Sequence, residues 1–162
     1  MLVILSGLPG TGKTTIAREL ARKLGAVHLR IDTIEQALRD KGLTVVDEGY
    51  RVAYALAEDN LRLGLTVIAD SVNPLQLTRE AWRDVASRAG TRSIDVEIIC
   101  SDEAEHRRRV ETREADIANH QLPTWDDVIA REYHAWSQHR LIVDTVHMNL
   151  KQASDLIVST LA

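Results

Sequence analysis

Residues 1–15 read MLVILSGLPGTGKTT, and this stretch decides the fold of the chain. The apolar run Leu2–Leu5 is long enough for a buried strand and too short for a helix. Residues 7–14 then match the pattern G-x-x-x-x-G-K-[ST] at every fixed position. Apolar residues recur every four positions from Ile16 to Leu24, as they do on one face of a helix. Strand, glycine-rich loop and helix in this order are the context in which such a loop cradles phosphate groups.

The predicted phosphate-binding loop consists of Gly7, Leu8, Pro9, Gly10, Thr11 and Gly12. Its three glycines can adopt backbone angles that are closed to other residues, and they place no side chain between the main chain and a phosphate. The backbone N–H groups of the loop are therefore expected to form a concave anion site at the positive end of the following helix.

The three residues after the loop supply side chains for the same task. Lys13 is predicted to place a mobile charge near the β- and γ-phosphates, and the Thr14 hydroxyl to ligate Mg²⁺. Thr15 is the expected hydroxyl donor to the α-phosphate. The alternative is an ordinary strand-to-helix turn that happens to contain three glycines, but such a turn would not explain why Lys13, Thr14 and Thr15 follow the loop. The sequence therefore predicts binding of a nucleoside triphosphate, expected to be ATP, together with Mg²⁺.

Length and composition are typical of a soluble globular protein. The chain has 162 residues, with 44% hydrophobic and 27% charged residues, and one domain spanning residues 1–162 is expected. A net charge of −4 gives no global attraction to nucleic acid or membranes. Cys100 is the sole cysteine, which excludes an internal disulfide, and Met1 runs directly into the first strand without a signal peptide. A cytoplasmic location and no membrane contact are expected.

Five short apolar strands are predicted to alternate with helices along the chain. Their expected ranges are residues 2–5, 26–29, 66–70, 93–100 and 141–144. This alternation indicates an α/β fold with a parallel sheet covered by helices on both faces. Helices are expected over residues 33–41 and 50–63, after Pro74, around residues 103–113, from Thr124 onward and over residues 150–161.

Two aspartates follow predicted strands, at the edge of the sheet where ligands bind in open α/β folds. Asp32 can accept the proton of an acceptor hydroxyl or hold that hydroxyl in line with the γ-phosphate; alternatively it is the N-cap of the helix over residues 33–41. Asp70 is predicted to hold the metal through water, or else to cap a loop by local hydrogen bonds. Arg30 lies on the same edge.

Arginines are concentrated in the segment 106–113, where Arg109 and Arg113 are four residues apart and are expected to share a helix face. We interpret this segment, with the aperiodic polar stretch 115–123, as a lid whose arginines balance phosphate charge. The alternatives are a solvated face paired with nearby glutamates and a nucleic-acid patch, which the interleaved acids weaken.

Further assignments concern the buried and exposed faces of two later helices. In the helix after Pro74, Trp82 and its apolar neighbours form the buried face, whereas Arg79, Arg83 and Arg88 are expected outside. Arg79 either meets an anionic acceptor or is solvated. The apolar residues Val128, Ile129, Tyr133 and Trp136 are expected to form one face of the helix that begins at Thr124.

The whole pattern resembles the small P-loop kinases, in particular the kinase domain of phage polynucleotide kinase and bacterial AAA-type ATP-binding proteins of similar length. The resemblance rests on Gly7–Thr14, Arg30–Asp32, Ala69–Trp82, Arg107–Arg113 and Pro123–Trp125. It implies a three-layer fold with strand order 2-3-1-4-5 and a short lid at about residues 107–123. It also implies that Asp32 activates the acceptor hydroxyl and that Arg109 and Arg113 contact the phosphates.

The leading hypothesis is a kinase that transfers the γ-phosphoryl group of Mg-ATP to a hydroxyl of a small molecule. A polynucleotide 5′-hydroxyl kinase is the disfavoured alternative, because the net charge is −4 and no basic track flanks the site. A nucleotide-dependent switch that hydrolyses ATP slowly is the alternative from another class. A monomer or homodimer is expected, and residues 42–64 match no acceptor-site motif, so the acceptor stays open.

Overall fold

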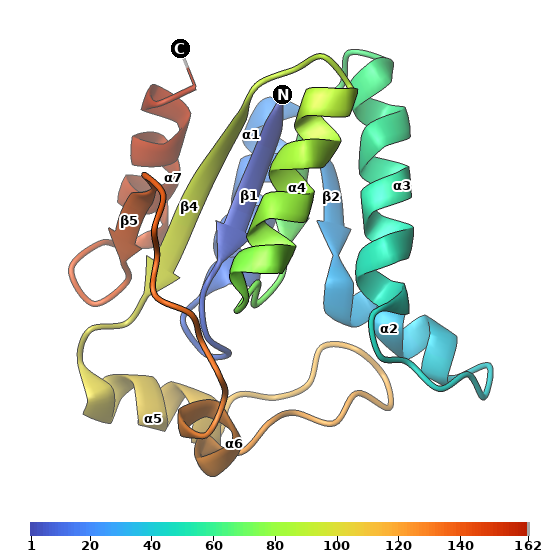
Figure 1. The fold of residues 1–162 in the computed structure, drawn as a ribbon. Helices are drawn as coiled ribbons and strands as arrows, with labels where there is room; N and C mark the ends of the chain where they lie inside the picture. The colour runs from blue at the N-terminus through green and yellow to red at the C-terminus, as the bar shows by residue number, and fades with distance from the viewer. Residues whose placement is uncertain (162) are drawn as a thin grey trace.

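The computed structural model describes residues 1–161, in which helices and strands alternate (Figure 1). The strands are β1 (Leu2–Ser6), β2 (Val27–Arg30), β3 (Val67–Asp70), β4 (Ser93–Ile99) and β5 (Leu141–Asp144). The helices are α1 (Lys13–Leu24), α2 (Ile31–Arg39), α3 (Glu48–Arg62), α4 (Gln76–Arg88), α5 (Glu103–Thr112), α6 (Trp125–Ile129) and α7 (Leu150–Ser159). None of these helices has both the length and the apolar composition needed to cross a membrane.

The strands form one parallel sheet in the order β2-β3-β1-β4-β5, which confirms the predicted order. β1 lies in the middle, and all five of its residues are buried. The register places Leu5 of β1 and Arg30 of β2 on either side of Asp70 in β3. The carboxyl ends of these three strands therefore meet at one level, directly beside the loop that follows β1.

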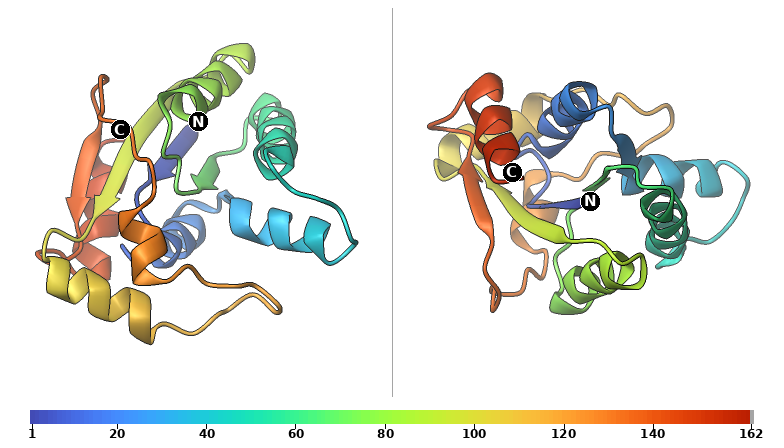
Figure 2. Two further views of the ribbon diagram at one scale, coloured as in Figure 1. Left: turned by 60° about the horizontal axis from the view of Figure 1, so that its bottom comes forward. Right: turned by 90° about the horizontal axis from the view of Figure 1, so that it is seen from above.

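Helices cover both faces of the sheet, as the alternation of strands and helices predicted (Figure 2). Successive side chains of a strand point to opposite faces, so β1 contributes to two separate cores. Leu2 and Ile4 pack in the core beneath α3 and α4, whereas Val3 and Leu5 pack in the core beneath α1 and α7. The result is the three-layer arrangement expected from the sequence.

The remaining segments gather at the carboxyl edge of the sheet, where α5, α6 and the connection between them cross below the strand ends (Figure 1). Residues 113–124, here named the lid segment, contain no helix or strand. Thr124 ends the lid segment and begins α6 with a capping box, in which its hydroxyl accepts from the Asp127 N–H and its own N–H donates to the Asp127 carboxylate. The predicted start of a helix at Thr124 is confirmed.

Several helix boundaries differ from the predicted ones. α2 begins at Ile31 with Arg30 at its N-cap, so Asp32 lies inside the first turn and is not the cap. Pro74 precedes the N-cap of α4, Leu75, and lies outside the first turn. α6 ends at Ile129, so the apolar face predicted to continue to Trp136 is wrong beyond that point. Tertiary contacts of residues 131–140, rather than helical spacing, decide where Trp136 packs.

Arg79 is the clearest correction, because it is only 2% exposed rather than on the outside of α4. Its guanidinium donates to four backbone carbonyls, those of Asn73, Pro74, His134 and Ala135. The guanidinium carbon also lies 3.9 Å from the centre of the Trp136 ring, a cation–π contact. Arg79 therefore joins the loop after β3 to the segment that leads from α6 to β5, and it does not face the cavity described below.

Replacing Arg79 tests this clamp. We expect Arg79→Met to reduce the free energy of unfolding by about 3 kcal/mol, because it leaves buried carbonyls without donors. Arg62→Met is the control, because Arg62 on α3 forms only an exposed ion pair with Glu58, and its change is expected within about 0.5 kcal/mol. Chemical denaturation of both variants measures the difference. Equal losses would contradict the assigned role.

Candidate functional site

A cavity of about 1000 Å³ opens at the carboxyl edge of the sheet, between the loop after β1 and the lid segment. Of the residues predicted for the site, it is lined by Pro9, Gly10, Gly12, Lys13, Thr14, Thr15, Asp32, Asp70, Arg109 and Arg113. Gly7, Leu8 and Thr11 lie in the loop without lining the cavity. The structure therefore brings together side chains from α1, α2, β3 and α5 that are up to a hundred residues apart in sequence.

The glycines of the loop are required by close packing behind it. A Cβ atom on Gly7, whose φ is +143°, would lie 2.2 Å from the carbonyl oxygen of Ile98 in β4. A Cβ atom on Gly10, whose φ is +86°, would lie 2.5 Å from a methyl carbon of Val110 in α5. The backbone of β4 and a side chain of α5 thus contact the loop from two sides, and only glycine fits at positions 7 and 10.

His106 of α5 completes this packing and was not singled out by the sequence analysis. Its ring is buried, and Nε2 donates to the carbonyl oxygen of Pro9 at 2.8 Å. The ring also meets Trp125 of α6 edge to face, with centroids 5.2 Å apart. His106 therefore ties the start of the lid to the loop, a role hidden in the sequence by its place beside three arginines.

Lys13 lies over the loop rather than in solvent, with only 8% of the residue exposed. Its ammonium donates to the carbonyl oxygen of Leu8 at 2.8 Å. Burial lowers the pKa of Lys13 to about 8, although the carboxylates of Asp70 and Asp32 oppose this shift. The cavity therefore holds a cation that is poorly compensated until an anion enters.

Asp70 and Thr14 are the oxygen donors that the sequence assigned to a metal. Asp70 is buried at the end of β3, and its Oδ2 lies 3.1 Å from Nε2 of His28. Within residues 1–161, no group of three or more His, Cys, Asp or Glu residues is arranged to hold a metal ion. Mg²⁺ commonly takes only one or two protein ligands and completes its shell with phosphates and water. A hydroxyl and a carboxylate on the cavity wall fit that pattern.

Arg109 is held in place by several contacts. Its guanidinium donates to Glu105 at 2.7 Å and to the hydroxyl of Thr145 at 2.7 Å. The Thr145 hydroxyl in turn donates to the carbonyl oxygen of Thr11 in the loop, at 3.0 Å. Arg109 therefore lies beside the loop in a fixed orientation.

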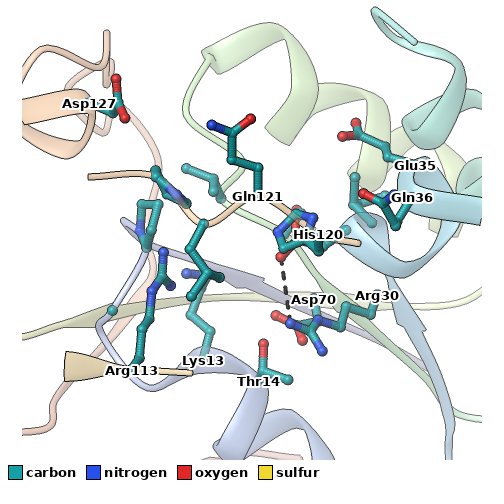
Figure 3. A pocket seen from close by; sticks show the side chains of 18 of the residues that line it. Lys13, Thr14, Arg30, Glu35, Gln36, Asp70, Arg113, His120, Gln121 and Asp127 are labelled. Atoms are coloured by element: carbon teal, nitrogen blue, oxygen red, sulfur yellow. Dashed lines mark ion pairs between the residues drawn. The ribbon is translucent and has the colours of Figure 1, made fainter. Parts of the chain in front are cut away.

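Arg113 differs from Arg109, because it lies one residue past the end of α5 with an extended backbone. The two arginines consequently do not share a helix face, although both line the cavity. Two guanidinium nitrogens of Arg113, Nε and Nη2, are buried without a hydrogen-bond partner. Burial lowers the pKa of this group. An anion in the cavity would supply the missing acceptors, and Figure 3 shows Arg113 and Lys13 on the same side of the cavity.

The lid segment is fastened to the body of the protein through Asp116, a residue that the sequence analysis left unassigned. Its carboxylate accepts two hydrogen bonds from Arg30, at 2.8 and 3.0 Å, and a third from Arg18 of α1 at 2.5 Å. The hydrogen bonds from Arg30 hold the pKa of Asp116 well below its ordinary value. Arg30 was expected at this edge, and its partner lies 86 residues later in the chain.

Asp32 projects from the first turn of α2 toward the same cavity, with 46% of its side chain exposed. Its carboxylate is 3.8 Å from the guanidinium of Arg30, which is a long ion pair. Glu35 and Gln36 follow on the same helix and also line the cavity. Helical spacing places Glu35 three residues after Asp32, on the same face, and this signal was available in the sequence.

Replacing Asp116 tests how the lid segment is held. We expect Asp116→Asn to speed amide exchange in residues 113–124 by roughly fivefold, because it weakens three hydrogen bonds of a partly exposed carboxylate worth about 1 kcal/mol together. Hydrogen–deuterium exchange with peptide-level mass spectrometry measures this effect. Asp155→Asn, which weakens the ion pairs of α7 with Lys151 and with Lys23 of α1, is the control and is expected to leave these peptides unchanged. Unchanged exchange in Asp116→Asn would contradict the assignment.

Comparisons with known proteins agree with this architecture. An uncharacterised protein of Mycobacterium tuberculosis is 34% identical over 115 residues, which cover 62% of this chain and 23% of that protein. A protein of Aeropyrum pernix named as a probable adenylyl-sulfate kinase is 31% identical over 120 residues, covering 67% of this chain and 63% of that protein. The chain thus spans about a quarter of the length of the mycobacterial relative and under two thirds of the archaeal one.

Solved structures share the fold at low identity. The APS kinase of M. tuberculosis, in complex with AMPPNP and APS, superposes with a TM-score of 0.75 at 19% identity, covering 99% of this chain and 96% of that chain. A gluconokinase from Sinorhizobium meliloti gives a TM-score of 0.66 at 16% identity, covering 98% and 90%. The AAA domain family matches residues 2–132, which is most of the chain. The chain therefore belongs to the AAA domain family and has the α/β fold of the small P-loop kinases.

Proposed function

We propose that this protein is an ATP-dependent phosphotransferase that moves the γ-phosphoryl group to a hydroxyl of a small molecule. The observation that carries the proposal is the buried guanidinium of Arg113, whose Nε and Nη2 lack partners. It shares one cavity with the loop lysine, Lys13, and with the exposed carboxylate of Asp32. Unpaired cations on one side and a carboxylate on the other are what phosphoryl transfer to a hydroxyl requires.

In this proposal the triphosphate binds to the N–H groups of residues 7–12, with the Lys13 ammonium near the β- and γ-phosphates. Thr14 and Asp70 would hold Mg²⁺, Asp70 through water, and the ion supplies charge neutralisation on the phosphate oxygens. Thr15 would donate its hydroxyl to the α-phosphate. The lysine moves only a short way, since it already lies over the loop and exchanges its bond to the Leu8 carbonyl for phosphate oxygens.

The transfer forms a bond between the acceptor oxygen and the γ-phosphorus and breaks the bond to the oxygen bridging the β- and γ-phosphates, so that ADP leaves. The Asp32 carboxylate orients the acceptor hydroxyl and accepts its proton. Arg109 and Arg113 balance the charge spread over the transferred group. Arg109 is oriented in advance by Glu105 and Thr145, which reduces the reorganisation required at the moment of transfer.

Residues 107–123 would act as the lid, with closure excluding water from the transferred group. The contacts of His106 with the loop and of Asp116 with Arg30 support this part of the proposal, because they join the start and the middle of the lid to the cavity rim. The cavity also extends past the loop to α2 and Tyr50. A switch that only hydrolyses ATP does not require space for a second substrate, so the additional volume favours transfer to an acceptor.

Asp32→Asn tests the assignment of the base. We expect kcat for acceptor-dependent ADP release to fall by about 10²–10⁴-fold, since the amide cannot accept the proton, while ATP affinity stays within about threefold. Steady-state ADP release and calorimetric ATP binding measure the two quantities. Lys13→Ala is expected to abolish turnover, and Asp59→Asn, at an exposed position on α3, to leave it unchanged. Full activity in Asp32→Asn would refute the role of this residue.

The lowered pKa of Lys13 predicts a pH dependence of nucleotide binding. In the free protein the ammonium loses its proton as pH rises through about 8, whereas bound phosphates favour the charged form and raise the pKa. Binding above pH 8 must therefore take up a proton, and affinity falls with rising pH. At pH 8.5, calorimetry in two buffers of different ionisation enthalpy is expected to give an uptake of roughly 0.8 proton. Lys13→Met is expected to show no such uptake, and identical uptake in that variant would contradict the explanation.

A further inference from the structure

The end of the cavity away from the loop has a distinct composition, and we name it the acceptor end. It is formed by Asp32, Glu35, Gln36 and Arg39 of α2, by Tyr50 and Ser71, and by His120 and Gln121 of the lid segment. Figure 3 shows Glu35 and Gln36 projecting from α2 on the side opposite Arg113, with Gln121 between them. This end is where the acceptor would lie in the proposed kinase reaction.

The arginines at the acceptor end are already paired with carboxylates of the protein. Arg39 donates to Glu35 at 2.9 Å, one helical turn away. Arg30, at the N-cap of α2, makes two hydrogen bonds to Asp116 and also faces Asp32, and within residues 1–161 only its Nε is left without a partner. Arg113 and Arg131 also line the cavity, but both act on Lys13 beside the loop, where their charges contribute to lowering its pKa. An anionic group on the acceptor would therefore find no arginine of α2 or its N-cap that is free of a carboxylate partner.

The carboxylates at the acceptor end, by contrast, keep binding capacity. Glu35 gives one oxygen to Arg39 and retains a second. A Cβ atom on Gly49 of α3 would lie 2.3 Å from Cγ of Glu35, so a buried glycine makes room for this side chain. Burial raises the pKa of the neighbouring Tyr50, and the charges of Glu35 and Asp32 raise it further. Both carboxylates therefore act on the same small volume.

Neutral hydrogen-bonding groups complete the acceptor end. The Ser71 hydroxyl lines the cavity beside Tyr50, whose pKa it lowers against the effect of burial, and belongs to a residue that is 4% exposed. Gln121 adds a side-chain amide that both donates and accepts, and Gln36, whose Nε2 donates to Asp40, adds an amide oxygen that accepts. A buried hydroxyl on a cavity wall is placed to pair with a polar group of a ligand. Several such groups in one half of a cavity suit a molecule that carries several hydroxyls.

We propose that the acceptor is a polyhydroxylated molecule without an anionic group, either neutral or bearing an amine. Its hydroxyls would pair with Asp32, Glu35 and Ser71, and an ammonium group would pair with the free oxygen of Glu35. A carboxylate, sulfate or phosphate on the acceptor would instead meet two carboxylates without a compensating cation. This inference rests on the proposed kinase function, which it makes more specific.

Two matched series of sugars test the inference with the wild-type protein saturated with Mg-AMPPNP. The ring series is glucose, glucosamine and glucuronate, and the open-chain series is sorbitol, glucamine and gluconate. In at least one series, we expect the amine to bind most tightly and the carboxylate to bind at least about tenfold more weakly than the neutral member, as calorimetry would measure. A carboxylate that binds as tightly as its neutral counterpart overturns the inference. So does the failure of every neutral and amine-bearing compound to bind.

The variant Glu35→Gln provides an independent test, because it removes one carboxylate and frees Arg39. We expect the amine-bearing sugar to bind about tenfold more weakly and the carboxylate to bind more tightly than in the wild type. Glu58→Gln is the matched control, since Glu58 forms a similar i,i+4 pair with Arg62 on α3 and does not line the cavity. It is expected to leave both affinities unchanged. An unchanged preference in Glu35→Gln would contradict the role of this residue.

Measuring ADP release with the same compounds separates this inference from the kinase proposal. Stimulation of ADP release by gluconate or glucuronate alone would support the kinase and overturn the acceptor class. The expected order of binding without any ADP release would support the acceptor class and refute the kinase. Stimulation by a neutral or amine-bearing sugar would support both.

Discussion

The close contact between the loop after β1 and the carbonyl of Ile98 in β4 is the constraint on which the site depends. Because Gly7 has no side chain, the loop can pass close to β4 after it leaves the middle of the sheet and before α1 begins at Lys13. α5 closes the other side of the loop, with Val110 against Gly10 and His106 bonded to Pro9. The loop is therefore held by a strand and a helix before any ligand binds. A rigid loop of this kind presents its N–H groups without a further ordering cost.

Burial of the loop also explains the electrostatics of the cavity. Lys13 is desolvated because it lies over the loop. Arg113 is desolvated at the end of α5, where it is partly buried. The nearby arginines Arg30, Arg39 and Arg109 are instead paired with protein carboxylates. The cavity consequently has two ends of opposite character. Two cations without an ion pair within residues 1–161, the buried Lys13 and the partly buried Arg113, lie near the loop, and carboxylates with unused oxygens lie near α2. This separation suits the proposed triphosphate at one end and the proposed hydroxyl-bearing acceptor at the other.

Most of the fold was predictable because each signal is local. The strands follow from short apolar runs, and α1 follows from the apolar residues that recur every four positions from Ile16 to Leu24. The capping box at Thr124 follows from the spacing of Thr and Asp. Errors occurred where distant residues compete with local periodicity. Arg79 has the spacing of an exposed position, yet it is buried because its guanidinium donates to four carbonyls and contacts the ring of Trp136. Trp136 has helical spacing from Val128, yet it stacks on Arg79 outside any helix.

The strand order followed from the resemblance to the small P-loop kinases, whereas the sequence by itself determined the glycine-rich loop, the parallel sheet, and the positions of Asp32 and Asp70 after β2 and β3. These features depend on short-range spacing and on the rule that parallel strands end at the same edge. Tertiary structure alone decided which charges remain unpaired. The partner of Arg30 is Asp116, which lies 86 residues away, and the absence of a partner for two nitrogens of Arg113 depends on where α5 ends. Pairing of charges is a property of distances in space, which no local pattern in the sequence encodes.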